Sequence, residues 1–119
     1  MAPIRVVVNG ATGKMGIETV AAVCREDGLT LAGATCHTPR GSNLPLPDGS
    51  SVPLSTNLEE LLKETTPDVL VDFTNATASM EASLMAAGMA VNLVLGASGL
   101  TDDNFKQLDA VANDKNIII

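Results

Sequence analysis

The sequence predicts an α/β domain in which a parallel sheet carries helices on both faces, the doubly wound arrangement of Rossmann-type domains. Short apolar runs rich in β-branched residues alternate with segments of helical periodicity along the whole chain. The runs are apolar throughout, which is typical of strands buried on both faces. A glycine-rich turn joins the first run to the first helical segment. The chain has 119 residues, the length of one ordinary domain.

The first elements form a strand–helix–strand unit. Residues 4–9 (IRVVVN) are mostly β-branched and stop at Gly10, so they predict a buried strand. Residues 14–26 follow with apolar side chains at helical spacing, and residues 29–35 predict a second strand. The helix positions that we expect to face the core are Ile17, Val20, Ala21 and Cys24.

A long irregular stretch, residues 37–53, separates the second strand from the next helix. Its prolines exclude a central strand, because proline cannot donate to a sheet ladder. The sequence Pro-Asp-Gly at residues 47–49 predicts a turn, since proline presets φ and glycine accepts a positive φ. We therefore expect a short hairpin at the edge of the sheet, formed by residues 44–46 and 52–54.

A capping box marks the start of the second helix. Thr56 and Glu59 have the required spacing, which predicts a helix that begins there and continues through Lys63. Residues 68–72 (DVLVD) then predict another buried strand.

The C-terminal part repeats the same alternation. Residues 76–87 predict a helix that Gly88 stops, and residues 91–95 predict a strand. Thr101 is expected to cap a last helix, after which residues 117–119 begin a further strand. The expected buried positions are Met80, Leu84 and Ala87 in the first of these helices, and Phe105, Leu108, Val111 and Ala112 in the second.

Composition excludes several classes of protein. The formal charge of −7 is unsuited to nucleic acid, and no apolar stretch approaches the ~20 residues that a membrane span needs. One histidine and two separated cysteines, Cys24 and Cys36, are too few for a zinc site or a disulfide framework. The N-terminus has no basic region followed by an apolar run, so we expect no signal peptide and a cytoplasmic protein with reduced thiols.

The strongest functional signal is the turn after the first strand. It has a GxxGxxG spacing in strand–turn–helix context, which is typical of a dinucleotide fingerprint. Such a turn brings free backbone N–H groups at a helix N-terminus close to a pyrophosphate. The alternative is a turn that only packs the helix against the strand. The candidate cofactor-binding residues are Gly10, Ala11, Thr12, Gly13, Lys14, Met15 and Gly16.

The end of the second strand bears on the choice between NAD(H) and NADP(H). No acidic residue is present there to bind the ribose 2′-hydroxyl of NAD, and Cys36 is followed by His37 and Arg40. Both basic side chains are able to face a 2′-phosphate, so the chemistry favours NADP(H). The alternative is that both are ordinary exposed loop residues.

Two further loops follow the third and fourth apolar strands. Thr74 lies in the first loop, and Gly96, Ala97 and Ser98 lie in the second. Ligands of open α/β sheets bind at the carboxyl ends of the strands, so these residues are candidates for contacts with a ribose or the nicotinamide amide. The alternative for each loop is an ordinary capped turn.

The motifs VVVNGATGKMG, VDFT and LGASGL together resemble dihydrodipicolinate reductase, also called 4-hydroxy-tetrahydrodipicolinate reductase. The resemblance covers the whole chain and the nucleotide-binding half of the family. It implies NAD(P)H-dependent reduction of a cyclic dicarboxylate imine in diaminopimelate and lysine biosynthesis. Residues 1–119 would be the dinucleotide-binding domain of an oxidoreductase. The family's domain for substrate binding, proton donation and homotetramer contacts would lie outside this chain.

Three departures from the family pattern stand out. Gly96-Ala97-Ser98-Gly99 replaces Gly-Thr-Thr-Gly, Asn75-Ala76 follows the Phe-Thr pair where many members have a proline, and Cys36 stands where members that favour NADH often have an acidic residue. We expect no catalytic residue in this chain and no turnover by it alone. Two alternatives stay open, a non-catalytic dinucleotide-binding module and an atypical short-chain dehydrogenase. The absence of tyrosine disfavours the second alternative.

Overall fold

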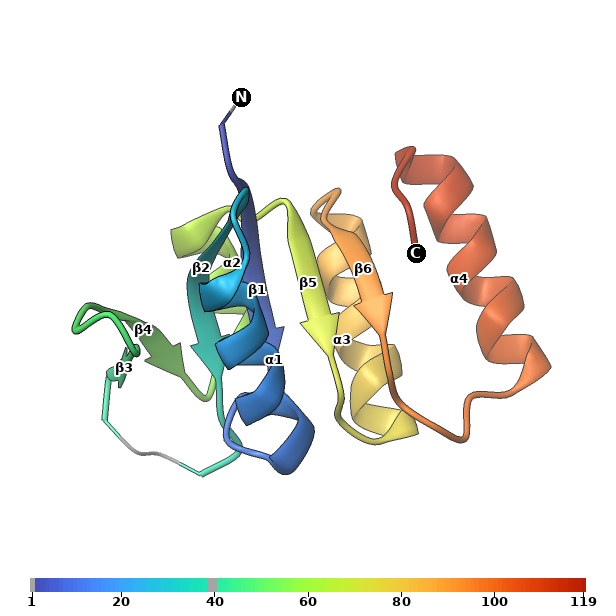
Figure 1. Ribbon diagram of the computed structural model, residues 1–119. Coiled ribbons are helices and arrows are strands. Elements are labelled where there is room, and N and C mark those ends of the chain that lie inside the picture. Colours follow the sequence, from blue (N-terminus) through green and yellow to red (C-terminus); the bar gives the residue numbers. More distant parts are fainter. Residues whose placement is uncertain (1, 39–40) are drawn as a thin grey trace.

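A computed structural model describes residues 2–38 and 41–119. Strands and helices alternate along these residues, apart from a hairpin in the first half (Figure 1). The elements are β1 (Ile4–Asn9), α1 (Lys14–Arg25), β2 (Leu29–Thr35), β3 (Asn43–Pro45), β4 (Ser51–Ser55), α2 (Leu58–Thr65), β5 (Val69–Asp72), α3 (Ala76–Gly88), β6 (Asn92–Leu95) and α4 (Asp102–Lys115).

The strands form one sheet in the order β3-β4-β2-β1-β5-β6. All neighbours run parallel except β3, which is antiparallel to β4 at the edge. The chain builds outward from β1 through β2, then returns to place β5 on the other side of β1. Strand order thus reverses between β1 and β5, and this reversal point is where open α/β sheets bind ligands. The predicted doubly wound class and the predicted edge hairpin are both confirmed.

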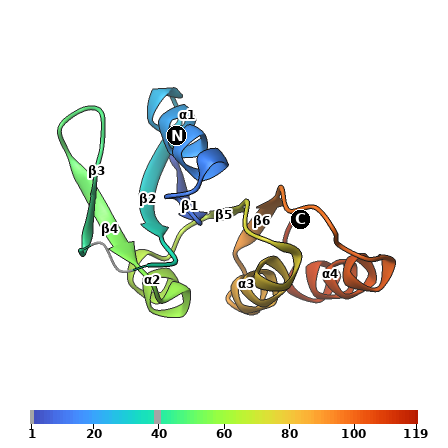
Figure 2. The ribbon, with the colours of Figure 1, turned by 90° about the horizontal axis from the view of Figure 1, so that it is seen from below.

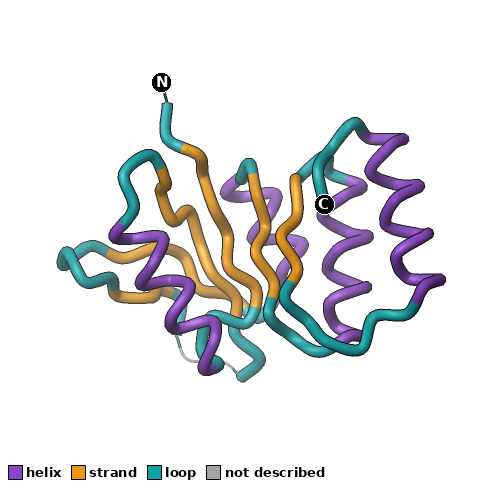
Figure 3. Tube along the Cα trace, turned by 45° about the vertical axis from the view of Figure 1, so that its right-hand side comes forward, coloured by secondary structure: helices purple, strands orange, loops and turns teal. Residues whose placement is uncertain are grey.

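Helices cover the two faces of the sheet unequally. Figure 2 shows α1 on one face and α2, α3 and α4 on the other, and Figure 3 shows the twisted sheet between them. Alternate side chains of β1 serve the two layers, with Val6 and Val8 packed in the core under α1 and Val7 in the core under α2 and α3. On the α1 side of β6, Val94 remains 53% exposed.

The buried face of α1 differs from the expected one. Ile17 is 57% exposed and Cys24 is exposed, whereas the buried residues of this helix are Gly16, Val20 and Val23. The close approach of Gly16 to the preceding turn fixes the helix rotation, and positions 20 and 23 then follow at helical spacing. Val20 is buried as predicted, but the predictions for Ile17 and Cys24 are wrong because apolar periodicity alone does not fix the rotation of the helix.

The expected face of α3 is also partly wrong. Leu84 is 42% exposed, and the buried positions are small residues: Ser79, Ala82, Ser83, Ala86 and Ala87. Small side chains let this helix lie close to the sheet and to α4, so size decides its orientation more than hydrophobicity. The helix also continues through Gly88 instead of stopping before it.

Three local predictions need correction. Asn57, not Thr56, caps α2, and its side chain accepts a hydrogen bond from the Glu60 amide. Phe105 is 55% exposed, because α4 packs on α3 at the edge of the sheet and only Leu108 of this helix is buried. Residues 117–119 form no strand, although the Leu93 amide donates to the Ile118 carbonyl.

No helix among the described residues has the length and apolarity to cross a membrane.

Candidate functional site

The glycine turn, residues 10–16, lies at the carboxyl edge of the sheet, where β1 ends beside β5. The loops after β5 and β6 reach the same edge (Figure 1). Two glycines of the glycine turn are required by the fold itself. Gly10 has a φ of +80°, and a Cβ atom at Gly16 would stand 2.0 Å from the Gly10 carbonyl oxygen. Ala11, within the turn, is buried.

Gly13 has no comparable role in the fold. Its φ is −77°, it is exposed, and an added Cβ atom would meet the Gly10 carbonyl oxygen at 3.6 Å, an ordinary contact. A side chain is thus tolerated by the protein, and the glycine leaves the space in front of the α1 N-terminus open. Neither the backbone conformation nor the packing of the described residues requires a glycine at this position.

The N-terminus of α1 differs from those of the other helices. Asn57, Asn75 and Thr101 each accept a hydrogen bond from their own helix, whereas Gly13 provides no side-chain acceptor for α1. The first turn of α1 contains no acidic residue and begins with the exposed Lys14. The unpaired N–H groups, the helix dipole and the lysine charge together favour an anion. These groups fit a pyrophosphate.

A hydrogen-bond relay ties the glycine turn to β2. The Gly10 amide donates to Thr35 Oγ1 at 3.0 Å, and the Ala11 amide donates to the Thr35 carbonyl at 2.9 Å. The Thr35 hydroxyl in turn donates to Asn9 Oδ1. Thr35 is 5% exposed, so its hydroxyl has little access to water as a substitute partner.

The relay continues to β5. Asn9 Nδ2 donates to Asp72 Oδ1 at 3.4 Å, and the same oxygen accepts from the Thr74 amide at 2.9 Å and the Thr74 hydroxyl at 2.7 Å. The predicted site residue Thr74 therefore has its hydroxyl proton directed to Asp72, and its methyl group lies 3.0 Å from where a Gly10 Cβ would stand. Its hydroxyl oxygen is left with acceptor capacity for a ligand.

Sequence reasoning missed Asn9, Thr35 and Asp72. Each is the last residue of its strand. Asn9 and Asp72 end apolar runs with a polar side chain at the carboxyl edge of the sheet. The available signal was a polar residue at the end of a buried parallel strand. Ligands of open α/β sheets bind at the carboxyl ends of the strands, so a polar side chain there is a candidate site residue.

The other predicted residues that the structure describes lie along the same edge with different exposure. Cys36 is 5% exposed and His37 is exposed, while Arg40 falls outside the described residues. Ser98 is exposed and Ala97 is half-buried in the loop after β6. At Gly96, an added Cβ would stand 2.2 Å from the Phe73 ring, so this glycine serves packing between the two loops.

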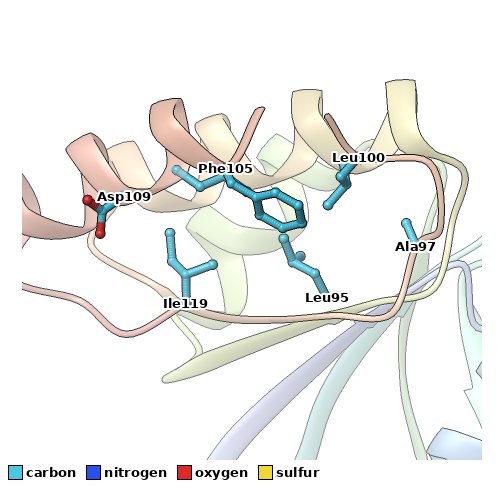
Figure 4. Close-up of a pocket in the computed structure, with 7 residues that line it drawn as sticks. Leu95, Ala97, Leu100, Phe105, Asp109 and Ile119 are labelled. Carbon is cyan, nitrogen blue, oxygen red and sulfur yellow. The ribbon is translucent and has the colours of Figure 1, made fainter. Parts of the chain in front are cut away.

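An apolar hollow of about 510 Å³ lies beside this loop, between β6 and α4. Figure 4 shows Phe105 pointing toward Leu95, with Leu100 beside the ring and Ile119 along the same hollow. Its lining is apolar apart from the Asp109 carboxylate, so it does not suit a phosphate or a dicarboxylate. It marks an incompletely covered edge of the sheet and lies apart from the glycine turn.

Comparison with known proteins identifies the family. The family model described as "Dihydrodipicolinate reductase, N-terminus" matches residues 4–119. The chain belongs to the dihydrodipicolinate reductase family. This result confirms the resemblance carried by the three motifs and decides against a short-chain dehydrogenase.

Relatives within the dihydrodipicolinate reductase family are longer than this chain. The chain is 46% identical to 4-hydroxy-tetrahydrodipicolinate reductase from Dehalococcoides mccartyi, covering 100% of itself and 46% of that protein. It is 34% identical to the enzyme of that name from Lysinibacillus sphaericus, covering 96% of itself and 44% of the relative. The chain therefore spans about half the length of the curated relatives that it matches.

Solved structures agree with this family assignment. Dipicolinate-bound dihydrodipicolinate reductase from Paenisporosarcina sp. TG-14 superposes with a TM-score of 0.81 and 30% identity, covering 95% of this chain and 44% of that one. D-galactose-1-dehydrogenase from Rhizobium etli has the same TM-score, 0.81, at 18% identity. That superposition covers 98% of this chain and 36% of the dehydrogenase chain. The second likeness shows the shared dehydrogenase fold alone.

Proposed function

We propose that this chain is the dinucleotide-binding half of an NAD(P)H-dependent 4-hydroxy-tetrahydrodipicolinate reductase in diaminopimelate and lysine biosynthesis. The observation that carries the proposal is Gly13, an exposed glycine that the fold does not require, at the uncapped N-terminus of α1. It lies at the reversal point of strand order, where dinucleotides bind in such sheets. Family membership supports the same cofactor class.

In this proposal the first turn of α1 binds the pyrophosphate. Backbone N–H groups after Gly13 donate to phosphate oxygens, and Lys14 adds a point charge. Gly10 and Gly16 let the turn lie close to Thr74 and to α1, so that these donors are presented at the carboxyl edge of the sheet. The loops that contain Thr74 and Ser98, after β5 and β6 at the same edge, orient the ribose and nicotinamide. The bound cofactor supplies hydride for reduction of the substrate.

NADP(H) is proposed to bind at least as well as NAD(H). The end of β2 presents the buried Cys36 and the exposed His37, and no carboxylate is available there for a ribose 2′-hydroxyl. A 2′-phosphate would therefore meet no like charge at this strand end.

Substrate chemistry is proposed to require a second domain of the cytoplasmic, homotetrameric enzyme. A dicarboxylate needs cations near the nicotinamide, and the reaction needs a proton donor. Lys14 is assigned to the phosphate turn, and Lys63 pairs with Glu59 at 3.2 Å in the last turn of α2. Arg5 donates to the Thr65 carbonyl near the opposite edge of the sheet. Exposed apolar surface at Val94 and Phe105 gives a further domain places to pack.

Calorimetric titration of the chain with NADPH and with NADH tests the proposal. We expect saturable binding of both at one site, with NADPH bound at least as tightly. Titration with adenosine alone is the matched control, because it lacks the phosphates that the α1 N-terminus would bind. Absence of binding by folded chain at millimolar dinucleotide contradicts the assignment of the site.

A further inference from the structure

Three buried or half-buried polar side chains close three adjacent strands of the sheet. Thr35 ends β2, Asn9 ends β1 and Asp72 ends β5, and these strands are neighbours in the order β2-β1-β5. Their side chains form one continuous chain of hydrogen bonds across the point where strand order reverses. The two members farthest apart, Thr35 and Asp72, are 5% and 0% exposed.

The Thr35 hydroxyl links the glycine turn to the relay, because it both accepts and donates a hydrogen bond. It accepts from the Gly10 amide at 3.0 Å and donates to Asn9 Oδ1. Valine has nearly the same shape but no hydroxyl, so it would leave the Gly10 N–H and the side-chain oxygen Asn9 Oδ1 without these partners. A polar group left unpaired away from water costs about 1–3 kcal/mol, and this cost favours a shift of the turn from its present position.

At its Asp72 end, the relay fixes the loop after β5, which contains Thr74. Asp72 Oδ1 holds both the amide and the hydroxyl of Thr74, and the Thr74 methyl group lies against Gly10. The glycine turn and the loop after β5 are thus held by one network and touch each other. Neither loop is able to shift without disturbing the other.

We propose that Thr35, Asn9 and Asp72 are positioning residues that set the glycine turn and the Thr74 loop in a binding-ready arrangement. The inference rests on the proposed dinucleotide function. None of the three needs to contact the ligand. Their effect comes from preorganisation, since a turn already fixed in its bound conformation loses less entropy when the ligand arrives. Loss of the relay therefore weakens dinucleotide binding beyond any loss of stability.

The test compares Thr35→Val with Thr35→Ser, which keeps the hydroxyl. Thr65→Val is the matched control, because Thr65 is 6% exposed and its hydroxyl donates to the Leu61 carbonyl within α2, away from the glycine turn. The readouts are the Kd for NADPH and for NADH by calorimetry and the thermal unfolding midpoint. We expect Thr35→Val to weaken binding about tenfold, which corresponds to about 1.4 kcal/mol. Thr35→Ser should stay within about twofold, and Thr65→Val should lower the midpoint without changing Kd.

Equal Kd values for Thr35→Val and the unmodified chain would overturn the inference and leave the proposed function standing. Failure of the unmodified chain to bind would overturn both. If Thr35→Val does not fold, Asn9→Ala replaces it, because it cuts the same relay at a half-buried position. Weaker binding by folded Asn9→Ala supports the inference, and unchanged binding contradicts it.

Discussion

Gly16 lies so close to Gly10 that a Cβ atom on it would stand 2.0 Å from the Gly10 carbonyl oxygen and 2.7 Å from Ala11 Cα. Backbone atoms cannot move aside as the end of a long side chain can. The third glycine of the motif is therefore a packing requirement between α1 and the turn that precedes it. Gly13, three residues earlier, has no such contact, and the two positions should respond differently to substitution.

Replacement of Gly16 by alanine should destabilise the fold. The added methyl group forces α1 away from the turn, and overpacking of this kind costs about 1–3 kcal/mol. Urea unfolding followed by circular dichroism measures the change. The control is Gly88→Ala, since nothing lies within 4 Å of a Cβ atom there and the residue is the last of α3. A Gly16→Ala variant as stable as the unmodified chain would show that the turn is looser than described.

Replacement of Gly13 by aspartate should change stability and binding in opposite directions. An aspartate N-cap accepts a hydrogen bond from the first turn and complements the helix dipole, which stabilises the fold by about 0.5–1 kcal/mol. The same carboxylate occupies the proposed pyrophosphate position and repels the ligand, so NADPH binding should weaken by about tenfold or more.

Unfolding and calorimetry on the same Gly13→Asp sample separate the two effects. Asn113→Asp on the exposed side of α4 adds the same charge elsewhere and serves as the control. Unchanged NADPH affinity in the Gly13→Asp variant is incompatible with a phosphate at the α1 N-terminus.

Replacement of His37 by aspartate should reduce NADPH binding more than NADH binding. His37 is exposed just after β2, where the added carboxylate would face a 2′-phosphate. Two unit charges about 4 Å apart in water interact by about 1 kcal/mol, so we expect about a fivefold shift toward NADH. Titration of both dinucleotides gives the ratio, with His37→Asn as the uncharged control. An equal change for both cofactors would place the adenosine ribose elsewhere.

The 119-residue chain should not oxidise NADPH in the presence of substrate. Hydride transfer requires the substrate carbon to be held about 3–3.5 Å from the donor, and the described residues offer no pair of cations beside the nicotinamide loops to hold a dicarboxylate. The substrate is generated by its upstream synthase, and absorbance at 340 nm is followed. A version extended through a relative's second half is the positive control. Turnover by the short chain would contradict the proposed division between domains.

Local patterns in the sequence were sufficient for the fold class and for the glycine motif. Continuous apolar strands, helical spacing and the position of GxxGxxG after the first strand involve residues within one turn or one run of each other. Such short-range features reflect backbone propensity and hydrophobic period, which neighbouring residues in the sequence define by themselves. The edge hairpin followed in the same way from Pro-Asp-Gly at residues 47–49.

Only the tertiary structure decided which face of each helix is buried and how the site is held. The contact of Gly16 with the turn rotates α1, and the small residues Ser79 and Ser83 let α3 lie close to the sheet. The relay joins Asn9 to residues 26 and 63 positions away in the chain. These residues become neighbours because parallel strands that are distant in sequence pair side by side, and no local pattern encodes that pairing.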